Sequence, residues 1–193
     1  MGKRKGVKKM NTKTKTQNLT LCAVMIALAT VLSKIEIPLW AQGGSITLAS
    51  MVPIVVVTYR LGTKWGFATA LGYSLIQMML GFSNVLYCPT LFTQILCILL
   101  DYVLAFSVLG LAKVFGKMGK NKRSRIIIGT AAVCFCRFIC HFLSGMLLWY
   151  SYAPQGKAVW LYSLTYNGSY MLVETIVTVT VTLALSRFIP ENN

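Results

Sequence analysis

The sequence predicts an all-α integral membrane protein with six transmembrane helices. Of its 193 residues, 56% are hydrophobic and only 12% are charged, whereas soluble domains carry about 25% charged residues. The apolar residues gather in long blocks that short polar connections separate. A chain of this composition has too little polar surface to cover a soluble fold, so we expect it to lie in a cell membrane.

Six apolar segments can be marked along the chain. A spanning helix needs about 20 residues, within a range of about 17–25. The second and third segments are short, so we expect tilt or partial spanning there, whereas the last three are long enough to cross with tilt. The segments are Leu19–Ile35, Ile46–Tyr59, Trp65–Leu80, Leu91–Val114, Ile126–Tyr150 and Val159–Phe188.

Basic residues give the chain its net charge of +15 and also predict its orientation. All 19 Lys and Arg residues except Lys34, Lys157 and Arg137 fall in the N-terminal tail, after the second or fourth segment, or at the end of the sixth. Basic residues concentrate on the cytoplasmic side of membrane proteins. We therefore place both termini in the cytoplasm, with residues 1–18 as a basic tail and residues 19–188 as a six-helix membrane domain. Because the basic residues alternate with apolar blocks, nucleic-acid binding is not expected.

Three polar residues from three segments are expected at one depth. At 1.5 Å per residue, Asp101, His141 and Asn167 lie about 12–15 Å below the outer surface. A carboxylate inside a bilayer is a functional candidate by default, and the alternative is a structural pair that braces the bundle. The shared depth favours a binding site.

One face of the fifth segment must turn into the bundle, because residues four apart share a helix face. Gly145 on this face leaves room for a neighbouring helix or for a ligand. At a deeper level, Glu174 of the sixth segment is expected to pair with Arg137. A pocket with a carboxylate, an imidazole, an amide and aromatic rings would suit a flat cationic molecule. The residues of the face are Arg137, His141, Gly145 and Trp149.

The sequence contains no convincing motif of an enzyme or of a metal-binding protein. There is one histidine, no nucleophile elbow and no paired catalytic carboxylates. The stretch from Gly110 to Met118 departs from a phosphate-binding loop in its glycine spacing and in having Met118 where Ser or Thr is needed. The six cysteines lack zinc-type spacing. We expect no enzyme, no metal and no cofactor.

Three stretches resemble the thiamine-specific substrate-binding (S) component of energy-coupling factor (ECF) transporters. The resemblance runs from about Leu19 to Phe188 and is most specific between His141 and Asn167. It implies a six-helix domain in the bacterial cytoplasmic membrane that binds thiamine from outside. It also implies a separate ECF module, a transmembrane coupling protein with two ATPase subunits, that powers release. The stretches are "GGSITLASMVPIVVVTYRLGTKWGFATALGYSLIQMMLG", "LLDYVLAFSVLGLA" and "APQGKAVWLYSLTYNGSY".

The resemblance also implies roles for individual residues. Asp101 matches an acidic residue that faces the cationic vitamin, although many members have Glu there. Ala23 and Ala27 match a small-residue motif that docks on the coupling protein. Tyr73 stands where some members have Trp, and Trp40 aligns only approximately. The implied substrate-binding residues are Asp101, His141, Trp149, Tyr162, Asn167, Trp40, Tyr73 and Tyr102.

Two alternatives to a thiamine-binding transporter component remain. In the first, the chain is an S component for another vitamin or for a thiamine precursor. In the second, it is a structural membrane protein whose buried polar residues only brace the bundle. Quenching of tryptophan fluorescence by thiamine would separate the thiamine-binding protein from the structural one.

Overall fold

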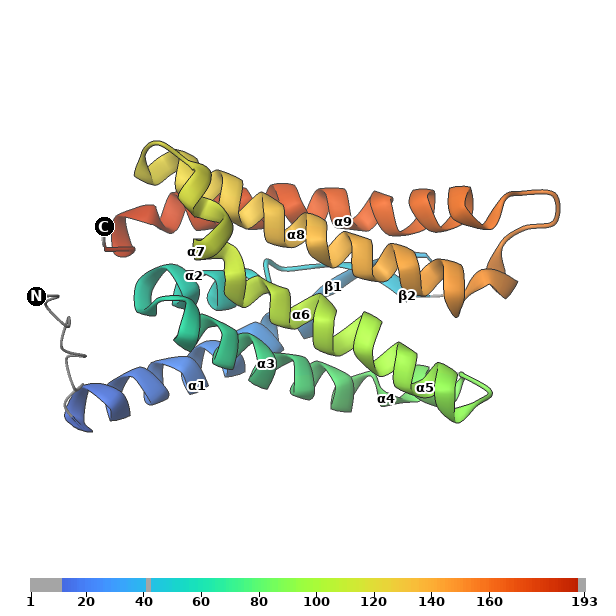
Figure 1. Ribbon diagram of the computed structural model, residues 1–193, viewed down its shortest axis with the longest axis horizontal. Coiled ribbons are helices and arrows are strands. Elements are labelled where there is room, and N and C mark those ends of the chain that lie inside the picture. Colours follow the sequence, from blue (N-terminus) through green and yellow to red (C-terminus); the bar gives the residue numbers. More distant parts are fainter. Residues whose placement is uncertain (1–11, 41–42, 191–193) are drawn as a thin grey trace, which may run out of the picture.

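The computed structural model describes residues 12–40 and 43–190, which form a helical bundle with one short β-hairpin (Figure 1). Each of the six predicted apolar segments contains a helix. The mostly helical membrane fold is therefore confirmed. The main elements are α1 (Thr12–Lys34), β1 (Glu36–Trp40), β2 (Gly43–Thr47), α2 (Val52–Leu61), α3 (Thr63–Leu80), α4 (Phe82–Leu86), α5 (Leu91–Cys97), α6 (Ala105–Ser107), α7 (Ala112–Phe115), α8 (Lys122–Leu147) and α9 (Val159–Ala184).

Within the described ranges, four helical segments are long and apolar enough to cross a membrane. Much of their surface is apolar and exposed, as on α1, where only Cys22 and Ala29 are buried. Exposed Leu, Val and Ile side chains of this kind suit contact with lipid rather than water. The four segments are Thr12–Lys34, Leu91–Met118, Lys122–Leu147 and Val159–Phe188.

Helix α2 has a different position from the long helices. It has 10 residues, and Val52 to Tyr59 are all buried. At 1.5 Å per residue such a helix is far shorter than a hydrocarbon core of about 30 Å. A helix that is apolar on every side belongs in a protein core, and α2 is enclosed by α1, α3, α7 and α9. The predicted segment Ile46–Tyr59 begins too early, because Ile46 and Thr47 belong to strand β2.

The second of the four long segments is irregular in its middle. It runs from Leu91 to Met118, and its stretch Ile98–Leu104 is a π-helix. Asp101 and Tyr102 lie in this stretch. π-Helical turns are rare in proteins, and those that occur are often found at functional sites. The irregular backbone therefore marks Asp101 as a candidate functional residue.

The hairpin of β1 and β2 was not predicted. The two strands are antiparallel, with Glu36 opposite Thr47 and Pro38 opposite Ser45. The predicted apolar segments leave residues 36–45 between them only as a connection, which contains Pro38, Gly43 and Gly44. Two strands alone are marginal in water, and here the hairpin is supported by α9, against which β2 packs.

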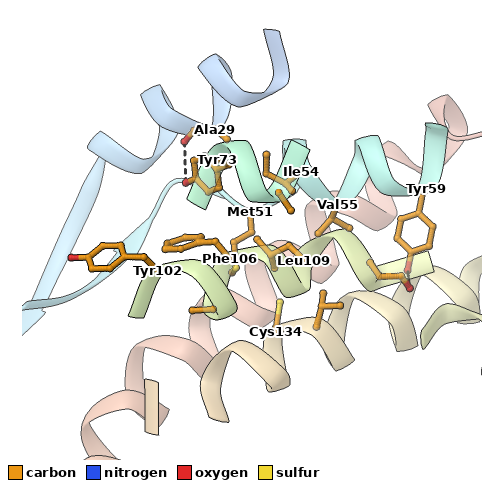
Figure 2. Close-up of a cluster of buried hydrophobic side chains, with 14 of the residues drawn as sticks. Ala29, Met51, Ile54, Val55, Tyr59, Tyr73, Tyr102, Phe106, Leu109 and Cys134 are labelled. Atoms are coloured by element: carbon orange, nitrogen blue, oxygen red, sulfur yellow. Dashed lines mark hydrogen bonds between the residues drawn. The ribbon is translucent and has the colours of Figure 1, made fainter. Parts of the chain in front are cut away.

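The core lies between α2, α3, the segment Leu91–Met118 and α8 (Figure 2). Tyr73 and Phe106 meet edge to face with their ring centroids 5.3 Å apart. At the end of the bundle where α1 begins, the Tyr59 hydroxyl lies within donating distance of the Arg125 and Ala112 carbonyl oxygens, at 3.0 and 3.3 Å. The basic connection before α8 lies at this end, and the turns that join α3 to α5 and α8 to α9 lie at the other (Figure 1).

Candidate substrate-binding site

A cavity of about 790 Å³ opens between the hairpin and the helices at the end away from the basic connection. This volume lies in the range of small-molecule sites. Its wall is rich in aromatic rings and holds one basic residue, Lys34, and two carboxylates, Asp101 and Glu36. Six of the eight predicted binding residues line it: Asp101, Tyr102, His141, Trp149, Tyr162 and Asn167.

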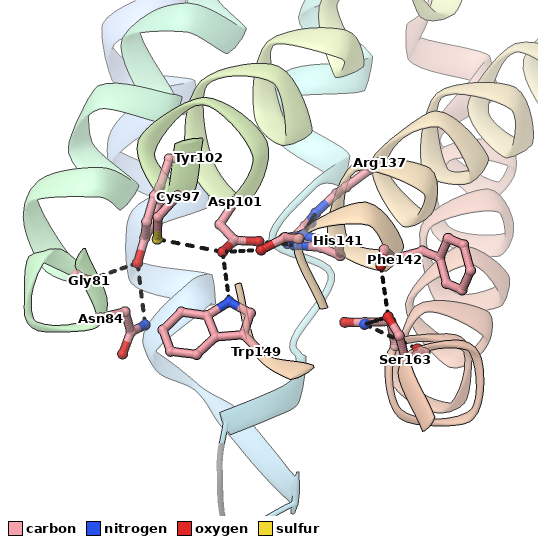
Figure 3. Close-up of polar contacts among 12 residues, drawn as sticks. Gly81, Asn84, Cys97, Asp101, Tyr102, Arg137, His141, Phe142, Trp149 and Ser163 are labelled. Atoms are coloured by element: carbon pink, nitrogen blue, oxygen red, sulfur yellow. Dashed lines mark hydrogen bonds and ion pairs between the residues drawn. The ribbon is translucent and has the colours of Figure 1, made fainter. Parts of the chain in front are cut away.

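Asp101 is the centre of a hydrogen-bond network (Figure 3). Its Oδ2 accepts from Ser144 Oγ at 2.7 Å, from Trp149 Nε1 at 3.2 Å and from Cys97 Sγ at 3.6 Å. Its Oδ1 lies 3.2 Å from His141 Nδ1. Hydrogen bonds to a charged group are stronger than neutral ones, so the carboxylate fixes these side chains in place before any ligand arrives.

His141 is held from both sides. Arg137 Nε donates to His141 Nε2 at 3.3 Å. A guanidinium can only donate, so Nε2 must accept and the ring proton must be on Nδ1, where it is donated to Asp101. The Arg137 guanidinium also lies 4.2 Å from the centre of the Phe106 ring. Arg137 is not among the cavity-lining residues, so its charge lies behind the imidazole.

Trp149 lies just outside the helix in which it was predicted. Helix α8 ends at Leu147, and the backbone N–H groups of Leu148 and Trp149 both donate to the Ser144 carbonyl. This tight ending keeps Trp149 on the face that carries His141, as predicted. The indole ring lies 6.1 Å from the Tyr152 ring, centroid to centroid, and the two rings form one aromatic wall of the cavity.

Helix α9 supplies the opposite wall. Tyr162, Tyr166 and Tyr170 are spaced four apart, and neighbouring ring centroids are 5.6 and 6.2 Å apart. The Tyr170 hydroxyl donates to Asn167 Oδ1 at 2.8 Å, and Asn167 Nδ2 donates to the Ser163 carbonyl and hydroxyl oxygens at 3.1 Å each. These hydrogen bonds fix the orientation of the Asn167 side-chain amide in the wall of the cavity.

Gly145 brings α8 and α9 together. A Cβ at this position would lie 2.3 Å from Ser163 Oγ and 2.9 Å from Asn167 Nδ2. Ser163 Oγ also donates to the Phe142 carbonyl at 2.8 Å. Of the two predicted uses of the space beside Gly145, the structure shows close approach of the neighbouring helix, and Gly145 also contributes to the cavity wall.

Glu174 connects the hairpin to α9. Its Oε1 accepts hydrogen bonds from the backbone N–H and the hydroxyl of Thr47, the latter at 2.7 Å, and the Glu174 side chain is buried. The predicted Arg137–Glu174 ion pair is wrong. Arg137 is directed to His141 and Phe106, and Glu174 to the end of β2, because the unpredicted hairpin places Thr47 beside α9.

The hairpin covers part of the cavity. Gly44 has a φ of +69°, a left-handed conformation that favours glycine. A Cβ there would lie 3.1 Å from Tyr166 Oη and from Tyr170 Cδ1. The hairpin therefore rests directly on the tyrosine row, and Glu36, Pro38, Gly44 and Ser45 join the cavity wall.

Tyr102 completes the wall on the side of α3 and α4. Its hydroxyl donates to the Gly81 carbonyl at 2.7 Å and accepts from Asn84 Nδ2 at 3.3 Å. These bonds tie the π-helical stretch to the turn after α3, next to Asp101 (Figure 3).

The other predicted residues lie elsewhere. Tyr73 is fully buried in the core, where its hydroxyl is 3.5 Å from the Ala29 carbonyl, and it does not line the cavity. Trp40 ends strand β1 opposite Gly43, but its side chain lies outside the described residues. Ala23 and Ala27 are exposed on α1, a placement that leaves them accessible to another protein or to lipid.

Several cavity or network residues were not predicted as site residues. Ser144 could have been suspected, since it follows His141 by three positions in an apolar segment. Tyr166 and Tyr170 follow Tyr162 at four-residue spacing and so share its helix face, whereas Glu36 and Ser45 carry no such signal, because their roles depend on how the hairpin packs on α9. Among the described residues, no group of three or more His, Cys, Asp or Glu side chains is arranged to hold a metal ion.

Comparison with known proteins gives one consistent family. The sequence profile described as "Thiamine transporter protein (Thia_YuaJ)" matches residues 19–193. The chain is 33% identical over 180 residues to the thiamine transporter ThiT of Bacillus subtilis, covering 87% of this chain and 89% of that protein. It is 32% identical over 158 residues to ThiT of Lacticaseibacillus paracasei, covering 73% of each.

A solved structure of ThiT from Listeria monocytogenes has a similar fold, with a TM-score of 0.72 and 25% identity over 91% of this chain and 96% of that one. The relatives are bacterial transporters rather than enzymes, in agreement with the predicted multi-pass protein of the bacterial cell membrane. From the profile match and these relatives, the chain belongs to the thiamine transporter protein family.

Proposed function

We propose that the chain is the high-affinity thiamine-binding component of an ECF-type vitamin uptake transporter. In this proposal a separate coupling protein and two ATPase subunits supply the energy of ATP hydrolysis. The observation that carries the proposal is the cavity of about 790 Å³, in which a carboxylate-centred network stands between two aromatic walls. Family membership supports thiamine as the ligand.

The chemistry of the cavity suits thiamine, which has a cationic thiazolium ring joined to a flat aminopyrimidine. Aromatic faces attract cations and stack on flat rings, and Trp149, Tyr152, Tyr162 and Tyr166 offer four such faces. Asp101 adds negative potential without an exposed, unpaired carboxylate. The Arg137 charge, which would repel a cation, stands behind His141.

We propose roles in binding for six of the predicted residues, four of them as direct ligand contacts. Trp149 and His141 would stack on the rings, while Tyr162 and Asn167 would provide polar contacts. Asp101 would act through its charge and by holding Trp149 and His141, and Tyr102 would close the side of the cavity. We do not extend a contact role to Tyr73, because it is in the core.

Topology is part of the proposal. The four long helices would span the bilayer, while α2 and α3 would lie inside the bundle or span it partly. The basic connection at residues 113–125 would face the cytoplasm by the positive-inside rule. The cavity, at the other end, would then open to the outside, and Ala23 and Ala27 would dock on the coupling protein.

Equilibrium binding of labelled thiamine to the purified protein in detergent tests the ligand assignment. We expect one saturable site, with unlabelled thiamine competing more strongly than its pyrimidine precursor or an unrelated vitamin such as riboflavin. Stronger competition by one of those compounds would mean that this compound, rather than thiamine, is the preferred ligand. Absence of saturable binding would favour a structural protein. Uptake that needs co-expression of an ECF module would support the transport assignment.

A further inference from the structure

A second cavity lies at the opposite end of the bundle from the thiamine site. It has a volume of about 480 Å³ and lies between α2, the connection from α7 to α8, and the segment after α9. Five basic side chains from both helices and their connection line it: Lys113, Lys117, Lys120, Lys122 and Arg125. No Asp or Glu is among its described lining residues.

The positive charges are not neutralised within the part of the chain that the structure describes. The one ion pair recorded there joins His141 to Asp101, in the other cavity. Five unpaired cations around one concave site create a strongly positive potential. The positive-inside rule accounts for basic residues at this end, but it does not account for their convergence on a cavity.

The walls of the cavity are fixed by backbone contacts. Arg125 Nε donates to the Gly119 carbonyl at 3.1 Å. A Cβ on Gly119 would come within 2.4 Å of the Arg125 backbone nitrogen, so the connection packs tightly against the start of α8. Tyr59 reaches the same turn through its bond to the Arg125 carbonyl. The guanidinium is therefore held in a rigid frame.

The first turn of α8 adds backbone donors. Asn121 caps this 26-residue helix by accepting from the Ser124 N–H at 2.8 Å, and Asn121 and Lys122 both line the cavity. The N–H groups of the first helical turn have no partners within the helix and favour anions. Together with the five cations, they suit a phosphate group.

Apolar surface surrounds the basic cavity. Ile126 and Ile189 line it, and on the outside of the same helical connection Val114 is 42% exposed and Met118 68% exposed. With the topology proposed above, these side chains would lie where acyl chains meet headgroups. A free phosphate ion would make no use of them, whereas a lipid would contact both parts.

We propose that this basic cavity binds the phosphate headgroup of an anionic membrane lipid. Basic pockets between membrane helices suit such headgroups, and each Lys or Arg near an anionic headgroup strengthens binding by about fivefold. The site is independent of the thiamine cavity and uses none of its residues.

The test is a titration of the purified protein in detergent with phosphatidylglycerol, with phosphatidylcholine and inorganic phosphate as separate arms. Thermal unfolding gives the readout and does not depend on thiamine. We expect phosphatidylglycerol to raise Tm saturably, and the other two to have little effect at matched concentration. A triple variant, Lys117→Gln with Lys120→Gln and Lys122→Gln, should weaken phosphatidylglycerol binding about a hundredfold.

A matched triple variant controls for net charge. Lys13→Gln with Lys15→Gln and Lys64→Gln removes three exposed charges at the same end of the bundle but outside the cavity. It should keep wild-type lipid affinity. If the first triple variant does not fold, Lys117→Gln and Lys120→Gln can be tested singly, each with an expected loss of about fivefold.

Three results would overturn the proposal. Equal losses in the two triple variants would mean diffuse surface charge rather than a site. Stabilisation by inorganic phosphate alone, lost in the first variant, would mean a soluble anion rather than a lipid. Unchanged lipid affinity in the first variant, with uptake lost in cells, would mean a surface for an acidic protein partner.

Discussion

Arg137 and His141 form a hydrogen bond in which the guanidinium Nε donates to the imidazole Nε2 at 3.3 Å. This bond selects the neutral imidazole with its proton on Nδ1, which is 3.2 Å from Asp101 Oδ1. The only histidine of the chain thus hydrogen-bonds both to Arg137, which does not line the cavity, and to Asp101, which does. The opposed charges leave the ring itself neutral and open to stacking.

His141 should make thiamine binding dependent on pH. The titratable or charged groups that face it are Asp101 from the segment Leu91–Met118, Arg137 from α8 and Tyr170 from α9. Protonation of Nε2 would place its N–H against the Arg137 Nε–H, so that two donors face each other, and would add a second cation beside a cationic ligand. We expect thiamine affinity to decrease as the pH is lowered from about 7.5 to about 5.5. The decrease should be at most about tenfold per pH unit.

The matched variant is His141→Gln, which cannot titrate. Its affinity at pH 7.5 should be lower than that of the wild type, and its pH profile should be flatter. Calorimetric titration at several pH values measures both. If the variant keeps the wild-type profile, the slope comes from the ligand's own pyrimidine and His141 has only a packing role.

Asp101→Asn should weaken thiamine binding by roughly ten- to a hundredfold, since a lost charge-assisted contact costs about 1.5–3 kcal/mol. The amide also offers its –NH₂ group where Ser144, Trp149 or His141 now donates. Glu36→Gln is the matched control, because Glu36 lines the same cavity but is exposed. Its affinity should stay within about twofold of the wild type. If both variants lost thiamine affinity to the same extent, Asp101 would have no special role in binding.

Glu174→Ala should loosen the hairpin, because it removes the acceptor of both Thr47 bonds. Hydrogen exchange should become faster at amides of β1 and β2, and thiamine should dissociate faster as this cover of the cavity opens more often. Glu174→Gln keeps one carbonyl oxygen and should have a smaller effect. Unchanged exchange in Glu174→Ala would show that the tyrosine row alone holds the hairpin.

Ala23→Leu with Ala27→Leu should block uptake and leave thiamine binding intact. Both positions are exposed on α1 and neither lines the cavity proposed to bind thiamine. Larger side chains would prevent close approach of a partner helix. Ala68→Leu with Ala184→Leu, exposed on α3 and α9, is the matched control and should transport normally. Normal uptake by the first variant in cells with the ECF module would contradict the docking role.

Part of the site could be predicted because depth follows from helical rise. Counting residues from the helix ends placed Asp101 and His141 in one layer, and their side chains are 3.2 Å apart. The row that contains His141 and Gly145 also turns inward as the four-residue spacing predicted. Both predictions depend only on local geometry, which the sequence carries.

The remainder depends on tertiary contacts. The π-helical stretch around Asp101 has no sequence pattern of its own, since its residues read as an ordinary apolar helix. Strand pairing of Glu36 with Thr47 depends on α9, which lies more than a hundred residues away along the chain. For the same reason Glu174 was assigned to Arg137, the nearest opposite charge by depth, rather than to Thr47.

The central claim is that thiamine binds in the cavity beside Trp149, and tryptophan fluorescence tests it most directly. Thiamine added to the purified protein should change the emission saturably, because its cationic ring would lie against the Trp149 indole. Trp149→Phe should lose most of this change and bind thiamine roughly tenfold more weakly, since it lacks the indole N–H bonded to Asp101. Trp160→Phe, an exposed site on α9, should keep both. A wild-type emission that thiamine leaves unchanged, or a saturable change that Trp149→Phe retains in full, would contradict the account.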